Sequence, residues 1–423
     1  MSDPSEHIVI VGAGAAGLMA ARELARAGRK VTILEARQRC GGRIHALPAS
    51  QFGYAADGGA EFVHGEAPVT RALLREAGLS LQEIEGEQWR FDGTKLTRER
   101  DDPHEAELQA KLADLKDDLT VADFLRRHFA GDNYAPLRHS IERMVEGYDA
   151  ADPERASTLA LRAEWMDGGH APQARIEGGY GAMIDVMTAD CRRHGVTIRL
   201  GSVVSAIAEE GGAVIVRCAG GDVHACDRMI LTVPLPLLRE IALPAGARAK
   251  LAAVDDIGFG NVIKILLRFA RPWWRERKED LADMTFLLSD EAIPVWWTRY
   301  PDQHPVLTGW FGGPRTAELE SLDARALIDA GLGSLAAIFG LPRDHIAREL
   351  VASAATNWAH DPFARGAYSW ATPRTRAAQA ILARGDGSVL FSGEALYRGR
   401  DMGTVEAALA SGLETADMIL RGQ

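Results

Sequence analysis

Three glycines and one glutamate near the start of the chain have the spacing of a dinucleotide-binding turn. Gly12, Gly14 and Gly17 follow an apolar run at residues 8–11, and Glu35 follows a second apolar run. This spacing lets the chain turn sharply, lets a pyrophosphate approach the backbone and lets the next helix pack closely on its strand. Free N–H groups at the start of that helix attract phosphate, and a carboxylate at Glu35 can accept hydrogen bonds from a ribose diol. These residues predict a site for NAD or FAD, which share this fold.

A second group of glycines and cations follows Glu35 closely. The segment reads ExRxxxGGR, in which Arg37 is followed by Gly41, Gly42 and Arg43. Two more glycines and a cation suit a second close approach to a pyrophosphate, by an extended cofactor that runs on into the protein. This group therefore extends the predicted cofactor site beyond the first turn.

One lysine interrupts an otherwise apolar run. Lys264 lies in the segment 260–269, whose other members are mostly Val, Ile, Leu and Phe, as in a buried strand. Burying an unpaired ammonium is costly, so such a lysine either reaches water at a sheet edge or serves a polar site. The segment by itself leaves both alternatives open.

The elements that must position these residues follow the order of an α/β protein. A strand at residues 8–11, a helix at 15–26 and a strand at 31–34 form the first βαβ unit. Further strands are predicted at residues 196–200, 203–207, 214–218, 228–233, 260–269, 285–288, 295–300, 306–311, 350–354 and 389–391. Helices are predicted at residues 70–78, 105–118, 121–129, 183–191, 324–339 and up to about 420, and a loop at 165–169. We interpret 68–162 as largely helical, with its charges on solvated faces.

Length and composition exclude several classes of protein. A chain of 423 residues is too long for one compact core, so two domains are expected. A net charge of −11 argues against general nucleic-acid binding and favours cationic substrates. The four cysteines have no CxxC spacing, so neither a metal site nor a redox pair is predicted. The polar start and the lack of a membrane-length apolar stretch predict a cytoplasmic protein without membrane attachment.

Five segments together resemble the flavin-dependent amine oxidases, the family of monoamine oxidases, polyamine oxidases and flavin histone demethylases. They are residues 7–43, the DGGAEFVHG segment at 57–65, the strand at 260–269, the aromatic segment 356–370 and the terminal segment 389–412. Read without the resemblance, 57–65 is a turn with a solvated histidine, and 356–370 is an aromatic loop packed in a core. The motifs stand in the family's order along effectively the whole chain.

The resemblance implies that FAD lies along the glycine-rich segments. Glu394 would contact its ribityl or pyrophosphate region, and the helix start near Gly403 would stabilise negative charge on the reduced ring. In monoamine oxidases that tether the flavin, a cysteine directly precedes the cage tyrosine; here Ala367 precedes Tyr368, so non-covalent FAD is expected. The residues expected to bind FAD are Gly12, Gly14, Ala15, Ala16, Gly17, Glu35, Ala36, Arg37, Gly42, Arg43, Gly59, Ala60, Glu61, Phe62, Val204, Trp358, Gly393, Glu394, Gly403, Thr404 and Val405.

Five residues are expected at the reacting centre from the same resemblance. Lys264 would hold a water against the flavin N5, and His64 would lie near the substrate amine with a pKa that responds near neutral pH. Trp358 would flank the flavin, and Tyr368 would form one wall of an aromatic cage. Thr404 stands where monoamine oxidases have the second cage tyrosine, which leaves that wall open.

The fold implied is α/β, with a Rossmann-like FAD-binding domain and an interleaved α+β substrate-binding domain that has a mixed sheet flanked by helices. The FAD domain is expected at residues 1–67, 173–235 and 373–423, and the substrate domain at 68–172 and 236–372.

The predicted reaction is oxidation of an amine C–N bond to an imine, which water hydrolyses, while O2 is reduced to H2O2. The open cage and the negative charge favour an extended or polyamine-like substrate. Alternatives are a small monoamine or amino-acid substrate with Trp296 or Trp297 closing the cage, a flavoenzyme of the carotenoid-desaturase or protoporphyrinogen-oxidase type, and a non-catalytic FAD-bound module. A homo-oligomer is compatible with the sequence.

Overall fold

The computed structural model describes residues 6–99, 102–167, 173–384 and 387–422. One half of the molecule is built on a five-stranded sheet in which every neighbouring pair is parallel. In order across the sheet, the strands are β21 (Val389–Phe391), β13 (Arg228–Leu231), β1 (His7–Val11), β2 (Lys30–Leu34) and β9 (Thr197–Arg199). They come from three separate parts of the chain, and the predicted α/β fold is confirmed.

Helices cover one face of this sheet and a small antiparallel sheet covers the other. Helix α1 (Ala15–Arg26) packs against α13 (Val405–Leu420) and α8 (Gly179–Arg193), and α3 (Pro68–Ala77) joins the same apolar cluster. On the opposite face lie α9 (Ala245–Ala249), α12 (Thr375–Leu382) and the strands β10 (Val204–Glu210), β11 (Ala213–Cys218) and β12 (Val223–Cys226). Because both faces are covered, the parallel strands are apolar along nearly their whole length.

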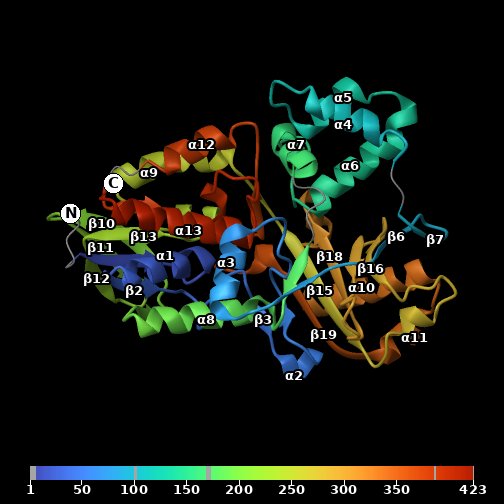
Figure 1. The fold of residues 1–423 in the computed structure, drawn as a ribbon, viewed down its shortest axis with the longest axis horizontal. Helices are drawn as coiled ribbons and strands as arrows, with labels where there is room; N and C mark the ends of the chain where they lie inside the picture. The colour runs from blue at the N-terminus through green and yellow to red at the C-terminus, as the bar shows by residue number, and fades with distance from the viewer. Residues whose placement is uncertain (1–5, 100–101, 168–172, 385–386, 423) are drawn as a thin grey trace.

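A seven-stranded mixed sheet forms the second half of the molecule (Figure 1). In order, its strands are β19 (Leu350–Asn357), β15 (Val262–Phe269), β18 (Val306–Gly312), β17 (Val295–Trp297), β16 (Met284–Leu288), β6 (Glu87–Phe91) and β7 (Leu96–Arg98). Only the β16–β6 pair is parallel. Helices α10 (Ala324–Phe339) and α11 (Arg343–Glu349) pack on it around a core that includes Trp273, Trp274 and Trp296. All three of these tryptophans are buried.

Two corrections concern the stretch that was predicted to be helical. Residues 87–91 and 96–98 are strands, because β6 gains its partner from β16, nearly two hundred residues further along the chain. Residues 165–167, predicted as loop, end helix α7 (Thr158–Asp167), whose start is capped by the Ser157 hydroxyl accepting from the Ala160 N–H at 3.0 Å. The rest of that predicted loop lies outside the described residues.

A layer of helices stands over the edge of the seven-stranded sheet in Figure 1: α4 (Glu105–Ala113), α5 (Val121–His128), α6 (Ala135–Gly147) and α7. Helix α4 ends five residues earlier than predicted. Asp118 instead accepts hydrogen bonds from the Ser157 hydroxyl and the Leu159 N–H, so its carboxylate serves the start of α7. Two short strands, β14 (Gly258–Gly260) and β20 (Tyr368–Trp370), pair below this layer.

Among the described residues, no single helix is long and apolar enough to cross a membrane; α10 and α11 meet that test only as a pair bent by 118°.

Candidate active site

A cavity of about 1300 Å³ lies between the two halves of the molecule. Val11 and Leu34, at the carboxyl ends of β1 and β2, line one end, and Tyr148 and Glu164 of the helical layer line the other. Ligand sites in open parallel sheets lie beyond the carboxyl ends of the strands. Because ordinary small-molecule pockets measure about 300–1000 Å³, this cavity has room for an extended cofactor together with a substrate.

The first glycine turn has the geometry that its spacing predicts. Gly12 has φ +108°, and a β-carbon on it would lie 2.5 Å from the Thr232 hydroxyl oxygen. A β-carbon on Gly17 would lie 2.0 Å from the Gly12 carbonyl oxygen, whereas one on Gly14 would meet no heavy atom within 4 Å. Gly14 therefore leaves open space where it lines the cavity, at the start of α1 and beside Ala15 and Ala16. No described side chain caps that start, so its N–H groups suit a phosphate.

Glu35 is held in place by backbone donors. One carboxylate oxygen accepts from the Ala13 N–H at 2.7 Å and the other from the Arg37 N–H at 2.8 Å. Each oxygen has a further lone pair for a ribose hydroxyl. Glu35, Ala36 and Arg37 all line the cavity, and the Arg37 guanidinium pairs with Asp361.

The second glycine group lies directly beside the first. The Gly41 N–H donates to the Ala13 carbonyl at 2.8 Å, and Gly42 adopts φ +59° next to Gly14. This arrangement places Gly42 in the cavity wall with Gly14, as the two-turn cofactor site requires.

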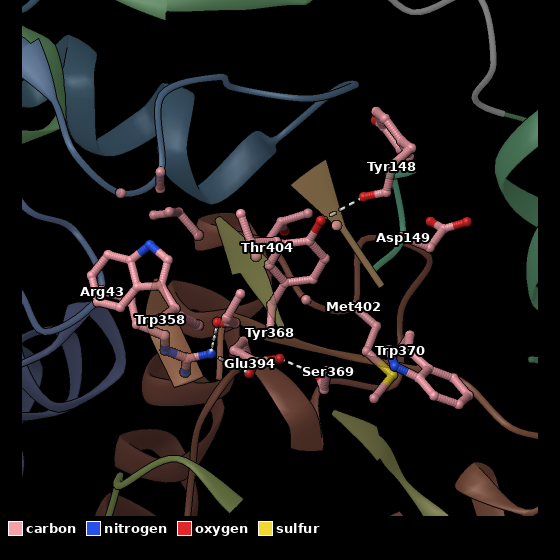
Figure 2. A pocket seen from close by; sticks show the side chains of 18 of the residues that line it. Arg43, Tyr148, Asp149, Trp358, Tyr368, Ser369, Trp370, Glu394, Met402 and Thr404 are labelled. Atoms are coloured by element: carbon pink, nitrogen blue, oxygen red, sulfur yellow. Dashed lines mark hydrogen bonds and ion pairs between the residues drawn. The ribbon is translucent and has the colours of Figure 1, made fainter. Parts of the chain in front are cut away.

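Arg43 joins the beginning of the chain to its end. Its guanidinium donates to Glu394 at 2.8 Å and to the Ala367 carbonyl at 2.7 Å, and Glu394 also accepts from the Ser369 hydroxyl (Figure 2). Gly393, Glu394 and Arg43 line the cavity together. Two predicted cofactor residues separated by 351 positions thus form one ion pair.

The segment predicted to lie beside the flavin ring is tightly packed. A β-carbon on Gly59 would lie 1.8 Å from the Arg43 carbonyl and 3.2 Å from the Trp358 ring, so only glycine fits. Ala60, Glu61 and Phe62 continue the wall. On other sides, Val204 of β10 and Gly403 and Val405 at the start of α13 also face the cavity.

The aromatic residues expected at the cage lie together. Trp358 is buried in one apolar cluster with the half-buried rings of Trp310 and Tyr368. The Tyr368 ring stacks on Trp310 with centroids 6.4 Å apart, and its hydroxyl donates to the Tyr148 carbonyl at 2.6 Å (Figure 2). Trp310 and Tyr148 are wall residues that sequence reasoning missed, since neither lies in a recognisable motif.

Thr404 caps helix α13. Its hydroxyl accepts from the Ala407 N–H at 3.2 Å and donates to the Asp401 carbonyl at 2.6 Å. Its neighbour Gly403 would, with a β-carbon, contact the Tyr368 ring at 3.4 Å. A small residue therefore stands next to the cage, as the open-wall interpretation requires, and its hydroxyl is occupied by the helix.

His64 lines the cavity, but its titration differs from the expectation. Its Nδ1 lies 3.0 Å from the Tyr148 hydroxyl, and burial lowers the pKa of the imidazole to about 4. A response near neutral pH, expected for an ordinary histidine, is therefore wrong; His64 stays neutral there.

Lys264 is fully buried, so the alternative that it reaches water at a sheet edge is excluded. It is also paired: its ammonium donates to Glu61 at 2.8 Å and to the Gly59 carbonyl at 3.0 Å. Glu61 was predicted as a cofactor residue, and its pairing with Lys264 was not predicted from the sequence.

Two carboxylic acids line the opposite end of the cavity, where charges were interpreted as solvated helix faces. Asp149 follows α6 and Glu164 lies on α7. Burial raises the pKa of Glu164 to about 7, with Asp401 adding to it, and burial with the nearby Glu164 charge raises that of Asp149 well above its usual range. The two side chains hydrogen-bond to each other. The interpretation of residues 68–162 as having solvated charges was wrong for Asp149, because no local pattern tells a cavity face from a solvated one; Glu164 lies just beyond that stretch.

A family comparison decides what the cavity is for. The family model of flavin-containing amine oxidoreductases matches residues 15–420. The chain belongs to this family. The glycine cradle, which consists of Gly12, Gly14, Gly17, Gly41 and Gly42, fits FAD together with the uncapped start of α1 and the ribose acceptor Glu35. No cysteine of the described residues lines the cavity, as non-covalent binding requires. The same described residues contain no group of three or more His, Cys, Asp or Glu that could hold a metal ion.

Relatives and solved structures place this amine oxidoreductase among several branches. It is 28% identical to lysine-specific histone demethylase 1 homolog 3 of Oryza sativa subsp. indica, over 98% of the chain and 54% of that protein. It is also 28% identical to probable polyamine oxidase 4 of Arabidopsis thaliana, over 86% of the chain and 76% of that protein. The chain spans about half the length of the histone demethylases that it matches.

Two solved structures share the fold. Putrescine oxidase bound to putrescine has a TM-score of 0.82 with 21% identity, covering 99% of both chains. Cyclohexylamine oxidase from Brevibacterium oxydans has a TM-score of 0.78 with 20% identity, again covering 99% of both.

Proposed function

We propose that this protein is an FAD-dependent amine oxidase for extended amines that carry a second positive charge. The amine C–N bond is oxidised to an imine, water hydrolyses the imine to a carbonyl compound and an amine or ammonia, and O2 is reduced to H2O2. Bound FAD would supply the chemistry by accepting a hydride equivalent and passing its electrons to O2.

The observation that carries this proposal is the acid pair at the far end of the cavity. Asp149 and Glu164 line the same cavity as Tyr368, on the side of the helical layer. A bound ammonium would favour ionisation of the pair, and the shared cavity would let one substrate reach both the pair and the aromatic cage. A substrate with a single small amine has no second ammonium that could pair with these acids.

The chain's own residues then position the reacting amine. Tyr368, Trp310 and Trp358 offer apolar faces that hold the carbon beside the nitrogen, and neutral His64 can hydrogen-bond to water or a substrate N–H. Lys264 would orient the water at the reacting centre. No strong protein base is needed for this reaction, so catalysis rests on positioning and electrostatics.

Similar proteins support an extended amine. Their printed names include a probable polyamine oxidase and a putrescine oxidase, and the histone demethylases act, by name, on lysine. A lysine side chain on a basic peptide is itself an extended, multiply charged amine, so peptides form the second candidate substrate.

Anaerobic mixing with an amine panel tests the proposal. Flavin absorbance should bleach fastest with spermidine or N-acetylspermine, more slowly with putrescine and slowest with tyramine, while a basic methyl-lysine peptide tests the second candidate. Bleaching by tyramine about tenfold faster than by spermidine would contradict the extended-substrate proposal. No bleaching by any amine would instead support a non-catalytic FAD module.

We also propose a cytoplasmic location, without a nucleic-acid partner.

A further inference from the structure

The most heavily hydrogen-bonded carboxylate of the cavity wall is Glu61. Besides Lys264, it accepts from the Arg175 guanidinium at 2.9 Å and from the Trp297 indole N–H at 3.1 and 3.2 Å. Arg299 lies 3.7 Å away. These groups come from three different strands and from the loop after β17, so the carboxylate cannot turn without breaking contacts to all of them.

Two hydrogen bonds leave one N–H of the Lys264 ammonium for another partner. An ammonium has three N–H groups, and two of them are used by Glu61 and the Gly59 carbonyl. Lys264 lines the cavity, so the third N–H remains for that side. With two bonds holding the ammonium, the direction of the third is set by the position of the Glu61 carboxylate.

The charges around Lys264 explain why a carboxylate is needed there. Burial alone would raise the pKa of Glu61, but the positive charges of Lys264, Arg175 and Arg299 outweigh it and hold the pKa at about 2. Burial raises the pKa of the nearby Asp57 to about 7, and Asp57 does not line the cavity. The ionisable groups that interact within this cluster are Glu61, Asp57, Tyr54, Arg175, Arg299 and Lys264.

We propose that Glu61 is the positioning residue of Lys264: its carboxylate holds the buried ammonium in place beside two arginines and aims the remaining N–H into the cavity. This inference rests on the proposed role of Lys264 at the reacting centre, and it holds for any amine substrate. The contrasting role for Glu61 is structural, as a staple that only joins β8 (Ala174–Ile176), β15 and β17.

The deciding experiment is a pH titration of the FAD-loaded Glu61→Gln variant. Glutamine keeps the shape and a hydrogen-bond acceptor but removes the charge, which leaves three cations together and makes loss of the Lys264 proton easier. The absorption spectrum of bound oxidised FAD, followed from pH 6 to 10, should show a transition that the wild type lacks and that Glu61→Gln/Lys264→Met lacks again. The rate of anaerobic reduction should fall by about tenfold or more across the same range.

Asp190→Asn is the matched control. Asp190 is also a buried carboxylate that pairs with arginines, at 2.8 Å from Arg22 and 2.7 Å from Arg26, and it does not line the cavity. This variant should lose stability without gaining a spectral transition. If the spectrum and the reduction rates of Glu61→Gln match those of the wild type at every pH, the positioning role is overturned and only the structural role of Glu61 remains.

A second variant covers failure of Glu61→Gln to fold. Glu61→Asp keeps the charge but withdraws the carboxylate from the 2.8 Å contact with Lys264. It should bind FAD, show no transition and reduce its flavin about tenfold more slowly, because the ammonium loses its orientation. Wild-type reduction rates in this variant would overturn the proposal. If no amine reduces the wild type, the spectral titration still tests Glu61, so failure of the proposed function is distinguishable.

Discussion

Two parts of the cavity wall hold carboxylates in opposite states: Glu61 is buried, and Asp149 and Glu164 are half-buried. In one part, Glu61 is surrounded by Lys264, Arg175 and Trp297 and has its pKa lowered to about 2. At the helical-layer end, Asp149 and Glu164 have each other as close neighbours, and burial raises the pKa of Glu164 to about 7. Burial alone has the same sign at both ends, so the neighbouring charges decide the outcome.

The difference between the two sets of carboxylates matches two different roles. A carboxylate that is already paired with protein cations is rigid and stays ionised at every physiological pH, as suits a group that orients a catalytic residue. No ion pair joins Asp149 or Glu164 to a cation of the described residues. Such a pair gains most when a cation from outside arrives, as suits recognition of a charged substrate. Changing each of these groups in turn tests the two roles.

Removing the cation at the paired end should have the largest effect. Lys264→Met should keep FAD, since Lys264 is not in the glycine cradle, but should slow flavin reduction or reoxidation by about 10²–10³ through loss of one oriented polar group. Stopped-flow absorbance measures both steps. Wild-type rates in both would show that the paired end has no catalytic role.

Neutralising the acid end should affect one class of substrate. Asp149→Asn should lower kcat/KM for spermidine by about 10- to 100-fold and change that for tyramine by less than about twofold, because tyramine has no second ammonium. Steady-state H2O2 production with both amines measures the ratio. Equal losses for the two amines would indicate a general defect instead of substrate recognition.

The same end predicts a pH dependence. Glu164 must lose its proton to bind an ammonium, and its pKa lies at about 7. In the wild type, kcat/KM for spermidine should therefore fall as pH drops below 7, and Asp149→Asn should flatten this limb.

Narrowing the cavity between the two ends should have a smaller effect. Thr404→Tyr adds a ring near Tyr368, which should shift the spermidine-to-tyramine ratio of kcat/KM toward tyramine by about tenfold. The variant also loses the Thr404 cap of α13, worth about 1 kcal/mol of stability, so its Tm should fall by a few degrees. Thr404→Ser, which keeps the cap, is the control and should leave the ratio unchanged.

His64 provides the case of burial without a charged neighbour. Its pKa is lowered to about 4, so the unfolded chain binds the extra proton between pH 6.5 and 4 and the folded protein does not. The free energy of unfolding should therefore decrease as the pH is lowered through this window, by about 1 kcal/mol between pH 6.5 and 5. His64→Asn should lose this component of the slope in urea unfolding; an unchanged slope would show that His64 titrates normally.

Local patterns were sufficient where neighbouring residues act together. The turn at Gly12–Gly17, the strands on both sides of α1 and the acceptor Glu35 were all predicted, because strand, turn and helix lie within thirty residues and their geometry depends on short-range sterics. The second glycine group at Gly41 and Gly42 was predicted in the same way, whereas the resemblance to amine oxidases added the aromatic segment. The exact domain boundaries and the catalytic roles of the site residues stay predictions.

Which charged residues of the site contact one another depends on long-range packing. The local pattern predicts that Lys264 lies in an apolar strand. Its partner Glu61 is 203 positions away and meets it only because β15 packs beside the loop after β4 (Ala56–Asp57). The sequence predicts a solvated charge at Asp149, because helical spacing says which residues share a face and not what that face meets. Charge states follow from burial and from neighbours within a few ångströms, and long-range packing sets both.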